Sequence, residues 1–201
     1  MQLIIISGPS GSGKTTLSKI ILKRLKDGII LNTDNYYRTG LISQILSKTV
    51  PCYFDRKISF NYNLFKQDLE FILKNGFSNA FYLYNFKNKT IKKIYKKSKN
   101  IRFVIVEGIF GQEIFKSLSS NKCIFIKIKT SKQTCMKRVI KRDCLERGKS
   151  KNHAKKDFLK AWELFFKYKK KNITRNYLKK IIYRNKSDIN YLLKKITKIA
   201  N

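Results

Sequence analysis

Short apolar runs recur along the chain, and segments with apolar residues at helical spacing separate them. The runs with the length of a buried strand are residues 3–7, 29–32, 103–106, 123–128 and 181–183. Apolar residues three and four positions apart predict helices over residues 15–26, 63–74, 132–143, 155–170 and 189–196. Strands that are apolar throughout and alternate with helices are typical of a parallel sheet covered on both faces. We therefore predict an α/β fold with a sheet of about five strands.

The length of 201 residues is that of a single domain, and no internal repeat or linker-like stretch divides the chain. We expect one domain over residues 1–201 with a small helical lid around residues 138–155. Active sites in such folds lie at the carboxyl ends of the strands. Gly8, Asp34 and Glu107 fall at or just after predicted strand ends. These residues are therefore expected to meet at one edge of the sheet.

The composition excludes several classes of protein. The hydrophobic fraction of 42% and the aromatic fraction of 13% are too high for a disordered chain. No apolar run approaches the ~20 residues of a membrane helix, and the first seven residues lack the basic segment of a signal peptide. The four cysteines form no CxxC pair. We expect a cytoplasmic protein with no membrane segment and no disulfide framework.

The charge is strongly unbalanced, with 46 Lys and Arg against 12 Asp and Glu and a formal net charge of +34. Such an excess predicts weak, non-specific attraction to polyanions, including nucleic acids. We interpret the densest basic cluster as a solvated helical face or loop, with a nucleic-acid partner as the alternative. This cluster, which contains no acidic residue, comprises Lys87, Lys89, Lys92, Lys93, Lys96, Lys97 and Lys99.

A glycine-rich segment joins the first predicted strand to the first predicted helix. Residues 8–15 have the sequence GPSGSGKT and match the pattern GxxxxGK[ST] without deviation. Glycines let successive backbone N–H groups converge on phosphates, and the helix amino terminus adds its positive end. The lysine of this motif contacts the β- and γ-phosphates, and the hydroxyl after it can ligate Mg²⁺. The segment predicts a site for ATP or GTP formed by Gly8, Ser10, Gly11, Ser12, Gly13, Lys14, Thr15 and Thr16.

Two acidic residues that follow predicted strands are candidates for chemistry at this site. Asp34 comes after the second strand, where a carboxylate could accept the proton of an attacking hydroxyl. A capping or turn residue is the alternative role for Asp34. Glu107 ends the third strand and is placed to hold Mg²⁺ or its waters, together with Thr15.

Three arginines lie in or just after the predicted helix over residues 132–143. Arg138 and Arg142 are four positions apart and share a helical face. A cationic group that folds over a transferring phosphoryl group stabilises its charge and excludes water. We expect Arg142 and Arg147 to close over the γ-phosphate, with residues 146–149 forming a turn or lid after the helix. A solvated basic face is the alternative.

Taken in order, these motifs resemble the uridine kinase family of P-loop nucleoside kinases, which includes phosphoribulokinase-like relatives. Residues 8–16 look like the phosphate loop of this family, and residues 34–37 (DNYY) resemble its D-x-[FY]-Y segment. Residues 106–110 (VEGIF) match v-E-G-i-f, and residues 142–148 match the lid pattern R-D-x-x-E-R-G. The resemblance implies a P-loop NTPase-type fold and an ATP-dependent kinase that uses Mg²⁺.

The resemblance also implies a site for a small acceptor, namely a nucleoside. It makes Asp34 the base on the sugar 5′-hydroxyl and Asp55, in the segment YFD, the residue that holds the ribose hydroxyls. The segment YNF at residues 84–86 would line the base pocket. Lys89 stands where the family has a base-contacting histidine, and only Arg138 remains of the usual pair of lid arginines. The acceptor residues implied in this way are Asp34, Tyr37, Asp55, Tyr84, Phe86 and Arg138.

The leading hypothesis is therefore transfer of a phosphoryl group from ATP to the 5′-hydroxyl of a pyrimidine nucleoside such as uridine or cytidine. Its catalytic residues are Lys14, Asp34, Arg142 and Arg147, and its metal ligands are Thr15 and Glu107. Two alternatives remain open. One is a P-loop kinase that acts on another small metabolite, and the other is a nucleotide-dependent nucleic-acid-binding protein.

Overall fold

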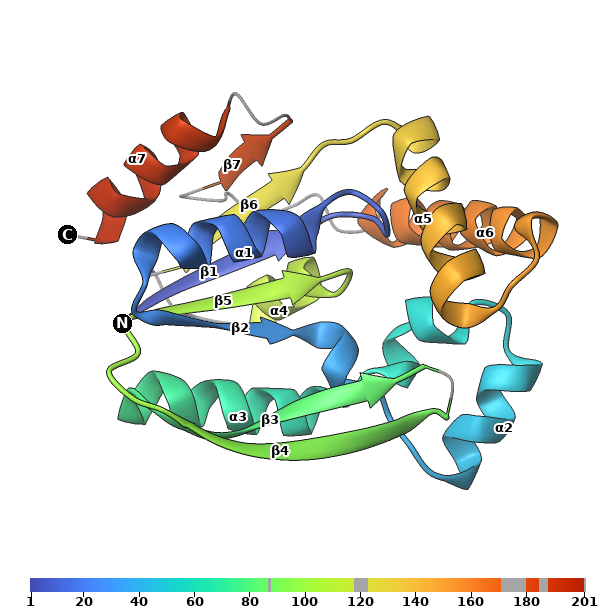
Figure 1. Ribbon diagram of the computed structural model, residues 1–201, viewed down its shortest axis with the longest axis horizontal. Coiled ribbons are helices and arrows are strands. Elements are labelled where there is room, and N and C mark those ends of the chain that lie inside the picture. Colours follow the sequence, from blue (N-terminus) through green and yellow to red (C-terminus); the bar gives the residue numbers. More distant parts are fainter. Residues whose placement is uncertain (87, 118–122, 171–179, 185–187, 201) are drawn as a thin grey trace.

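A five-stranded parallel sheet forms the centre of the computed structural model, which describes residues 1–86, 88–117, 123–170, 180–184 and 188–200. The strand order is β2-β5-β1-β6-β7, so β1 lies between strands that come much later in the chain. Figure 1 shows the strands running in one direction, with their carboxyl ends toward α5 and α6. The α/β fold predicted from the sequence is confirmed, and so are its five sheet strands: β1 (Gln2–Ser7), β2 (Gly28–Asn32), β5 (Phe103–Gly108), β6 (Cys123–Ile128) and β7 (Lys180–Tyr183).

Helices cover both faces of the sheet because successive residues of each strand point to opposite sides. On one face, Ile4 and Ile6 of β1 pack in one cluster with Leu17 of α1 (Lys14–Leu25) and Leu192 of α7 (Ile189–Ala200). On the other face, Leu3 and Ile5 pack in a second cluster with residues of α3 (Tyr62–Asn75) and α4 (Gly111–Ser117). The strands are consequently buried on both sides, which explains their unbroken apolar sequences.

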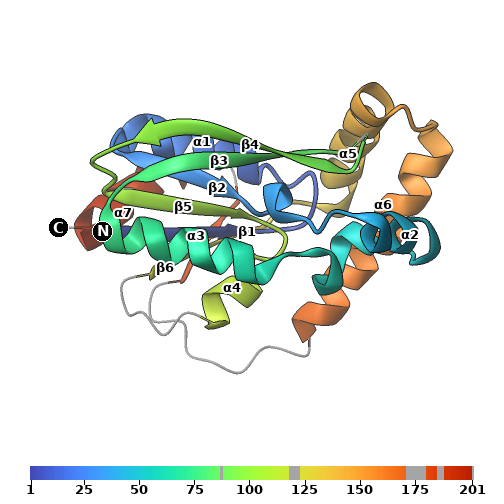
Figure 2. The same cartoon turned by 90° about the horizontal axis from the view of Figure 1, so that it is seen from below.

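Two further helices lie beyond the carboxyl ends of the strands. α5 (Lys132–Arg147) and α6 (Lys151–Lys170) pack against each other through Cys135, Val139 and Phe158. Figures 1 and 2 both show this pair at the opposite end of the molecule from α7. The predicted helix end at residue 143 was too early: α5 continues through Arg147, so of the expected turn or lid over residues 146–149 only Gly148 and Lys149 follow the helix. Gly148 ends the helix in the left-handed conformation, at φ 64°.

A β-hairpin between α3 and β5 was not anticipated. β3 (Ser78–Asn85) and β4 (Thr90–Ser98) pair antiparallel as a separate two-stranded ribbon beside α3 (Figure 2). The interpretation of the lysine cluster as a helical face or loop is wrong for Lys92, Lys93, Lys96 and Lys97, which belong to β4, whereas Lys99 lies in the loop after it. Lys89 lies in the hairpin turn, and Lys87 lies outside the described residues.

Short helical segments connect β2 to α3. The chain passes through a 3₁₀ turn over Thr33–Tyr36, the helix α2 (Leu41–Thr49), and two more 3₁₀ turns over Tyr53–Asp55 and Lys57–Ser59. These segments bring residues from the middle of the chain to the carboxyl edge of the sheet. Among the residues that the structure describes, no helix combines the length and the apolar character needed to cross a membrane.

Candidate active site

The glycine-rich loop between β1 and α1 is sharply bent and tightly packed. Gly11 and Gly13 have φ values of 76° and 97°, a conformation that residues with a Cβ rarely adopt. A Cβ on Gly8 would lie 2.7 Å from the Ser12 Oγ, and one on Gly11 would lie 2.5 Å from the Cys135 carbonyl oxygen. The Ser12 hydroxyl is buried and lacks a hydrogen-bond partner among the described residues. The loop thus has the bend, the close packing and the unsatisfied polar group expected of a phosphate cradle.

Lys14, Thr15 and Glu107 meet where this loop enters α1. The Lys14 ammonium is buried and donates to the carbonyl oxygen of Pro9 at 3.1 Å. The Thr15 hydroxyl donates to the Glu107 carboxylate at 2.9 Å. Burial lowers the pKa of Lys14, an effect that the nearby Glu107 and Asp34 oppose. Burial likewise raises the pKa of Glu107, and Lys14 opposes that shift. A buried cation and a buried carboxylate therefore lie together beside the loop.

Asp34 is held in place by the 3₁₀ turn that follows β2. The Asn32 side chain accepts a hydrogen bond from the Asp34 backbone N–H at 2.8 Å and caps this turn. The Tyr37 hydroxyl donates to the Asp34 carboxylate at 3.2 Å. Burial, together with the charges of Asp34 and Asp55, raises the pKa of Tyr37 well above its ordinary value. Tyr37 consequently stays protonated and acts as a donor that orients Asp34.

Asp55 is the second carboxylate of the site. It ends the 3₁₀ turn Tyr53–Asp55, and burial raises its pKa to about 6, with the Asp34 charge acting in the same direction. Arg147 and Arg142 oppose this shift. The charges of both lid arginines and of Lys14 thus reach the same carboxylate, which places Asp55 between the loop and the lid.

A cleft of about 470 Å³ opens beside these residues, a volume that suits a small organic ligand. The phosphate loop contributes Ser10 to its lining, and Asp34 and Asp55 contribute carboxylates. The lid contributes Arg142 and Arg147, whereas α2 and the hairpin turn contribute a further set of side chains that includes Ser47, Lys48, Phe86 and Lys89. The cleft therefore reaches from the phosphate loop to α2, beneath α5 and α6.

Aromatic rings form one wall of the cleft. Tyr37, Phe54 and Phe86 line it, with ring centroids 5.1 to 5.9 Å apart in edge-to-face arrangements. Tyr84 packs against Phe86 at 5.0 Å and belongs to the buried core behind this wall. The Arg147 guanidinium lies 4.2 Å from the Phe86 centroid, within the range of a cation–π interaction. Arg147 therefore lies on the aromatic side of the cleft.

A buried carboxylate organises the lid cations. Asp143 accepts two hydrogen bonds from Arg142, at 2.9 and 2.7 Å, and a weaker one from Arg147 at 3.4 Å. Lys149 lies 3.8 Å from the same carboxylate and also donates to Asp157 of α6 at 2.6 Å. Asp143 is 3% exposed, whereas the side chains of Arg142, Arg147 and Lys149 are 25 to 34% exposed, so one buried carboxylate fixes partly exposed lid cations relative to one another.

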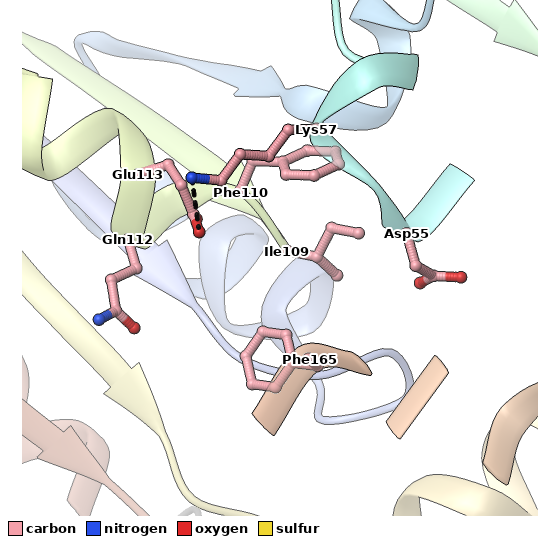
Figure 3. A pocket seen from close by; sticks show the side chains of 7 residues that line it. All are labelled: Asp55, Lys57, Ile109, Phe110, Gln112, Glu113 and Phe165. Carbon is pink, nitrogen blue, oxygen red and sulfur yellow. Dashed lines mark ion pairs between the residues drawn. The ribbon is translucent and has the colours of Figure 1, made fainter. Parts of the chain in front are cut away.

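A second, much smaller cavity lies behind Asp55 (Figure 3). Its volume of about 20 Å³ holds little more than one water molecule. Lys57 and Glu113 form an ion pair at 3.8 Å on one side, and the Asp55 carboxylate points away from that pair. Ile109 stands between the pair and Asp55 in this view. The cavity is therefore a gap in the packing behind the cleft, too small for an acceptor.

Comparison with known proteins connects this geometry to a family. The family model described as "Phosphoribulokinase / Uridine kinase family" matches residues 3–178 of the chain. The chain belongs to this family. It is 29% identical over 163 residues to the uridine kinase of Borrelia duttonii, covering 80% of this chain and 76% of that protein. The uridine kinase of Leuconostoc citreum is 32% identical over 155 residues, which cover 74% of this chain and 71% of that protein.

Solved structures share the fold at lower identity. YFH7 from Saccharomyces cerevisiae superposes with a TM-score of 0.64 at 13% identity, covering 92% of each chain. A possible uridine kinase from Bacillus stearothermophilus gives a TM-score of 0.51 at 14% identity, covering 90% of this chain and 88% of that one. Membership of the phosphoribulokinase/uridine kinase family, together with this fold, makes the chain an ATP-dependent kinase, and so a transferase.

In this family member, most residues singled out from the sequence come together around the loop and the cleft. Tyr84 and Thr16 lie elsewhere, and Arg138 is at the loop but outside the cleft. The Arg138 guanidinium donates to the Gly11 carbonyl oxygen at 3.3 Å, so it contacts the loop and does not line the cleft. Tyr84 lies behind Phe86. Thr16 lies one residue further into α1 and lines a shallow hollow with Lys19.

Several contributors were missed by the sequence analysis. Phe54 was noted only as part of a motif, although it forms part of the aromatic wall. Asn32 caps the turn that carries Asp34. Ser47, from the unanticipated helix α2, reaches the cleft and contacts Lys89. Of these three contributors, only Asn32 could have been found from the local sequence. It lies two residues before Asp34 at a strand end, and Asn commonly caps such turns.

Proposed function

We propose that this chain transfers the γ-phosphoryl group of ATP to the 5′-hydroxyl of a pyrimidine nucleoside, with Mg²⁺ as cofactor. One observation carries this proposal. Asp34 and Ser10 of the phosphate loop line a cleft that is large enough for a nucleoside and has aromatic side chains on one wall, and Lys14 and the Thr15–Glu107 pair lie beside that loop. The uridine kinases of Borrelia duttonii and Leuconostoc citreum support a nucleoside as the acceptor.

The proposed donor site uses the loop and its flanking side chains. The backbone N–H groups of the loop and the Lys14 ammonium bind the triphosphate, and the Ser12 hydroxyl gains a partner. Thr15 and Glu107 fit Mg²⁺, which takes one or two protein oxygens and completes its shell with phosphate oxygens and water. Bound Mg²⁺ supplies charge neutralisation on the transferring phosphate. Thr15 would ligate the metal through an oxygen lone pair and could keep donating its hydrogen to Glu107.

The proposed chemical step takes place at Asp34. Its carboxylate, oriented by Tyr37, accepts the proton of the acceptor hydroxyl while the oxygen of that hydroxyl forms a bond to the γ-phosphorus. The bond from this phosphorus to the β–γ bridging oxygen breaks, and ADP leaves with the bonding electrons. Asp55 accepts hydrogen bonds from the ribose hydroxyls, and Phe86 packs against the base. Positioning and electrostatics supply most of the rate enhancement.

We propose that residues 138–155, at the corner between α5 and α6, act as the lid of a single domain. Arg142 approaches the γ-phosphate, since its charge already acts on both Lys14 and Asp55. Arg147 lies between the γ-phosphate and the acceptor, because its guanidinium contacts Phe86 of the acceptor site. Arg138 supports the loop backbone at Gly11.

The raised pKa of Asp55 predicts a pH dependence of acceptor use. The folded-state pKa of about 6 lies above the ordinary value of 3.8, so Asp55 becomes protonated in the enzyme as the pH falls below about 6. A protonated carboxyl group is a poorer acceptor for ribose hydroxyls. We expect kcat/KM for the nucleoside to fall toward tenfold per pH unit on the acid side, through a higher KM. Initial rates between pH 5 and 8 measure this limb.

The Asp55→Asn variant is the control for this profile. It should raise KM at pH 7.5 and remove the acid limb centred near pH 6, because the titrating group is gone. An unchanged limb in this variant would assign the titration to another residue and contradict the role of Asp55.

Removing the charge of Asp143 should disorganise the lid. The Asp143→Asn side chain keeps its size but places an amide N–H₂ against Arg142 or Arg147. We expect kcat to fall about 10- to 100-fold, with the affinity for ATP changed much less, since arginine contacts in the transition state are lost. Steady-state kinetics and ATP calorimetry measure both effects. Glu163→Gln, an equal change of charge at an exposed position of α6, should leave kcat unaffected.

A panel assay tests the proposed function against its competitors. The chain is incubated with Mg·ATP and, separately, with nucleosides, sugar phosphates or RNA, and the products are identified by mass spectrometry. Formation of nucleoside monophosphate with ADP supports the proposal. Transfer to another metabolite, or phosphate release stimulated by RNA and lost at raised salt, would contradict it.

A further inference from the structure

The β3–β4 ribbon carries a dense positive charge that no acidic residue of its own segment balances. Between Glu70 and Glu107 the sequence contains no Asp or Glu. β4 contributes four exposed lysines: Lys92, Lys93, Lys96 and Lys97. Burial raises the pKa of Asp68 on α3, and the charge of Lys93 opposes that shift. The other three lysines form no ion pair with a residue that the structure describes, so their charge is available to an anionic partner.

A β-bulge places two of these lysines next to each other at one end of the ribbon. The register shifts after Ser78, and Lys96 and Lys97 of β4 there oppose a single residue of β3. A bulge increases the local twist and changes the direction in which side chains point. Figures 1 and 2 both show this end of the ribbon beside the end of α3, at the opposite end of the molecule from α5 and α6. The two lysines are therefore remote from the lid.

An exposed aromatic ring adjoins the bulge. Tyr95 is 78% exposed, and its partner across the ribbon is the small side chain of Ala80. The Lys93 ammonium lies 5.2 Å from the Tyr95 ring centroid, within the range of a cation–π interaction. The same ammonium lies 5.9 Å from the ring of Tyr82, which packs against the buried core. The ribbon thus presents a tyrosine ring and an ammonium group together, on a support that the core holds in place.

A second aromatic pair lies at the same end of the ribbon. Phe77 directly precedes β3, and its ring packs edge-to-face against Phe71 of α3 at 5.3 Å. Phe71 is 44% exposed, and the exposed Lys74 follows it by three positions on the helix. Exposed aromatic surface and lysines consequently occur together on both elements that meet at this end.

We propose that this end of the β3–β4 ribbon binds a single-stranded nucleic acid, with the β4 lysines on its phosphates and Tyr95 stacked on a base. Proteins bind single strands without sequence preference through positively charged surfaces that carry aromatic rings, because every base has a π-face. A base inside a duplex is already stacked on both sides and offers Tyr95 no face. The inference does not rest on the proposed function, since neither Tyr95 nor the β4 lysines line the cleft.

The surface fits other anionic partners less well. Elements that lie on membranes present an apolar face to the lipid, whereas the exposed residues that follow Tyr95 are Lys96, Lys97, Lys99 and Asn100. Protein–protein interfaces are depleted in lysine, whose long side chain loses much conformational entropy when it is ordered. Lysines suit the regularly spaced phosphates of a nucleic acid, since their binding releases the counterions of the strand.

The experiment measures the binding of a labelled oligouridylate of about 15 nucleotides by fluorescence anisotropy over a series of salt concentrations. We expect the native chain to bind with a dissociation constant of about 1 to 100 µM. Tyr95→Ala should weaken binding by about 5- to 100-fold at unchanged salt dependence, because it removes stacking and no charge. Lys96→Gln combined with Lys97→Gln should lower the slope of log Kd against log salt by about 1.4, since each lysine on a single strand contributes about 0.7.

The chain offers a matched control for each variant. Tyr191 of α7 is 62% exposed, and the Lys195 ammonium lies 5.4 Å from its ring centroid. Tyr191→Ala removes the same kind of ring from another surface and should keep the native affinity within about twofold. Lys155→Gln combined with Lys156→Gln removes two exposed charges from α6 and should keep the native salt slope. Thermal unfolding establishes that each variant is folded.

Native affinity in a folded Tyr95→Ala chain would overturn this inference, and so would equal affinity for a duplex of the same length. Binding to vesicles of phosphatidylglycerol without binding to the oligonucleotide would identify a lipid surface as the partner and would overturn it as well. ADP formation with uridine is measured separately and should be native in every one of these variants. A chain that forms ADP but does not bind the oligonucleotide would contradict only this inference, and one that binds the oligonucleotide without forming ADP would contradict only the proposed function.

Discussion

Replacing Lys14 by alanine is expected to lower turnover at least about 1,000-fold. The Lys14 ammonium is buried beside the loop, within reach of the charges of Glu107 and Asp34. In the proposed complex the ammonium turns from the Pro9 carbonyl oxygen to the β- and γ-phosphates. During transfer, negative charge develops on the ADP leaving group, and the ammonium stabilises that charge. No neighbouring side chain in the loop can replace this cation. The effect is measured as kcat with saturating uridine and ATP.

The control for this variant is Arg24→Ala, in the last turn of α1 at an exposed position. It removes the same charge from the same helix and should retain native turnover within about twofold. Circular dichroism and thermal unfolding establish that Lys14→Ala is folded. Native turnover in a folded Lys14→Ala chain would show that the loop does not hold the transferred phosphate.

The Asp34→Asn variant is expected to lose turnover by about 100- to 10,000-fold while still binding ATP. Asparagine has the size of aspartate and can keep both the Tyr37 contact and the capped turn, so the cleft should retain its shape. Its amide is not basic and cannot take the proton of the attacking hydroxyl. We therefore expect the dissociation constant for Mg·ATP, measured by calorimetry, to change by less than about threefold as kcat collapses.

Asp68→Asn provides a matched comparison for that result. Asp68 of α3 also accepts a hydrogen bond from a tyrosine, at 3.0 Å from the Tyr36 hydroxyl, and it does not line the cleft. The Asp68→Asn variant should retain the native kcat even if its free energy of unfolding falls. An Asp34→Asn chain with native kcat would remove Asp34 from the chemical step.

The parallel sheet could be predicted because burial on both faces leaves a strong local signal. All five strands are apolar runs, and the observed ends differ from the predicted ones by no more than two residues. The phosphate loop was equally accessible, since the bend requires glycines at set positions and Gly11 and Gly13 indeed have positive φ. Such features depend on residues close together in the chain.

The hairpin was missed for the opposite reason. β4 alternates poorly, because Ile91 and Ile94 are three positions apart with two lysines between them, and a register shift interrupts the ribbon. A two-stranded ribbon with one partly buried face tolerates imperfect alternation of apolar and polar residues when that face packs against a core cluster, here the cluster that includes residues of α3. Lysine density, which suggested a solvated helix or loop, carries little information about secondary structure in a chain with a net charge of +34.

The site was predictable as a set of residues but not as an arrangement. Spacing identified Asp34, Glu107 and the lid motif, yet it could not show that Arg147 lies over Phe86 or that Arg138 supports the loop at Gly11. Nor could it place Lys89 against Ser47, since that contact depends on the register of an unanticipated hairpin and on α2. These contacts join segments far apart in the sequence, and tertiary packing decides them.

The most direct test of the account is to locate the transferred phosphate. The chain is incubated with Mg·ATP and uridine, and the product is examined by ¹H–³¹P correlation NMR. We expect a phosphorus coupled to the two ribose 5′ protons, formed in step with ADP and absent with Asp34→Asn. A folded chain that binds Mg·ATP but leaves the nucleoside unmodified, or places the phosphate on the 2′- or 3′-oxygen, would contradict it.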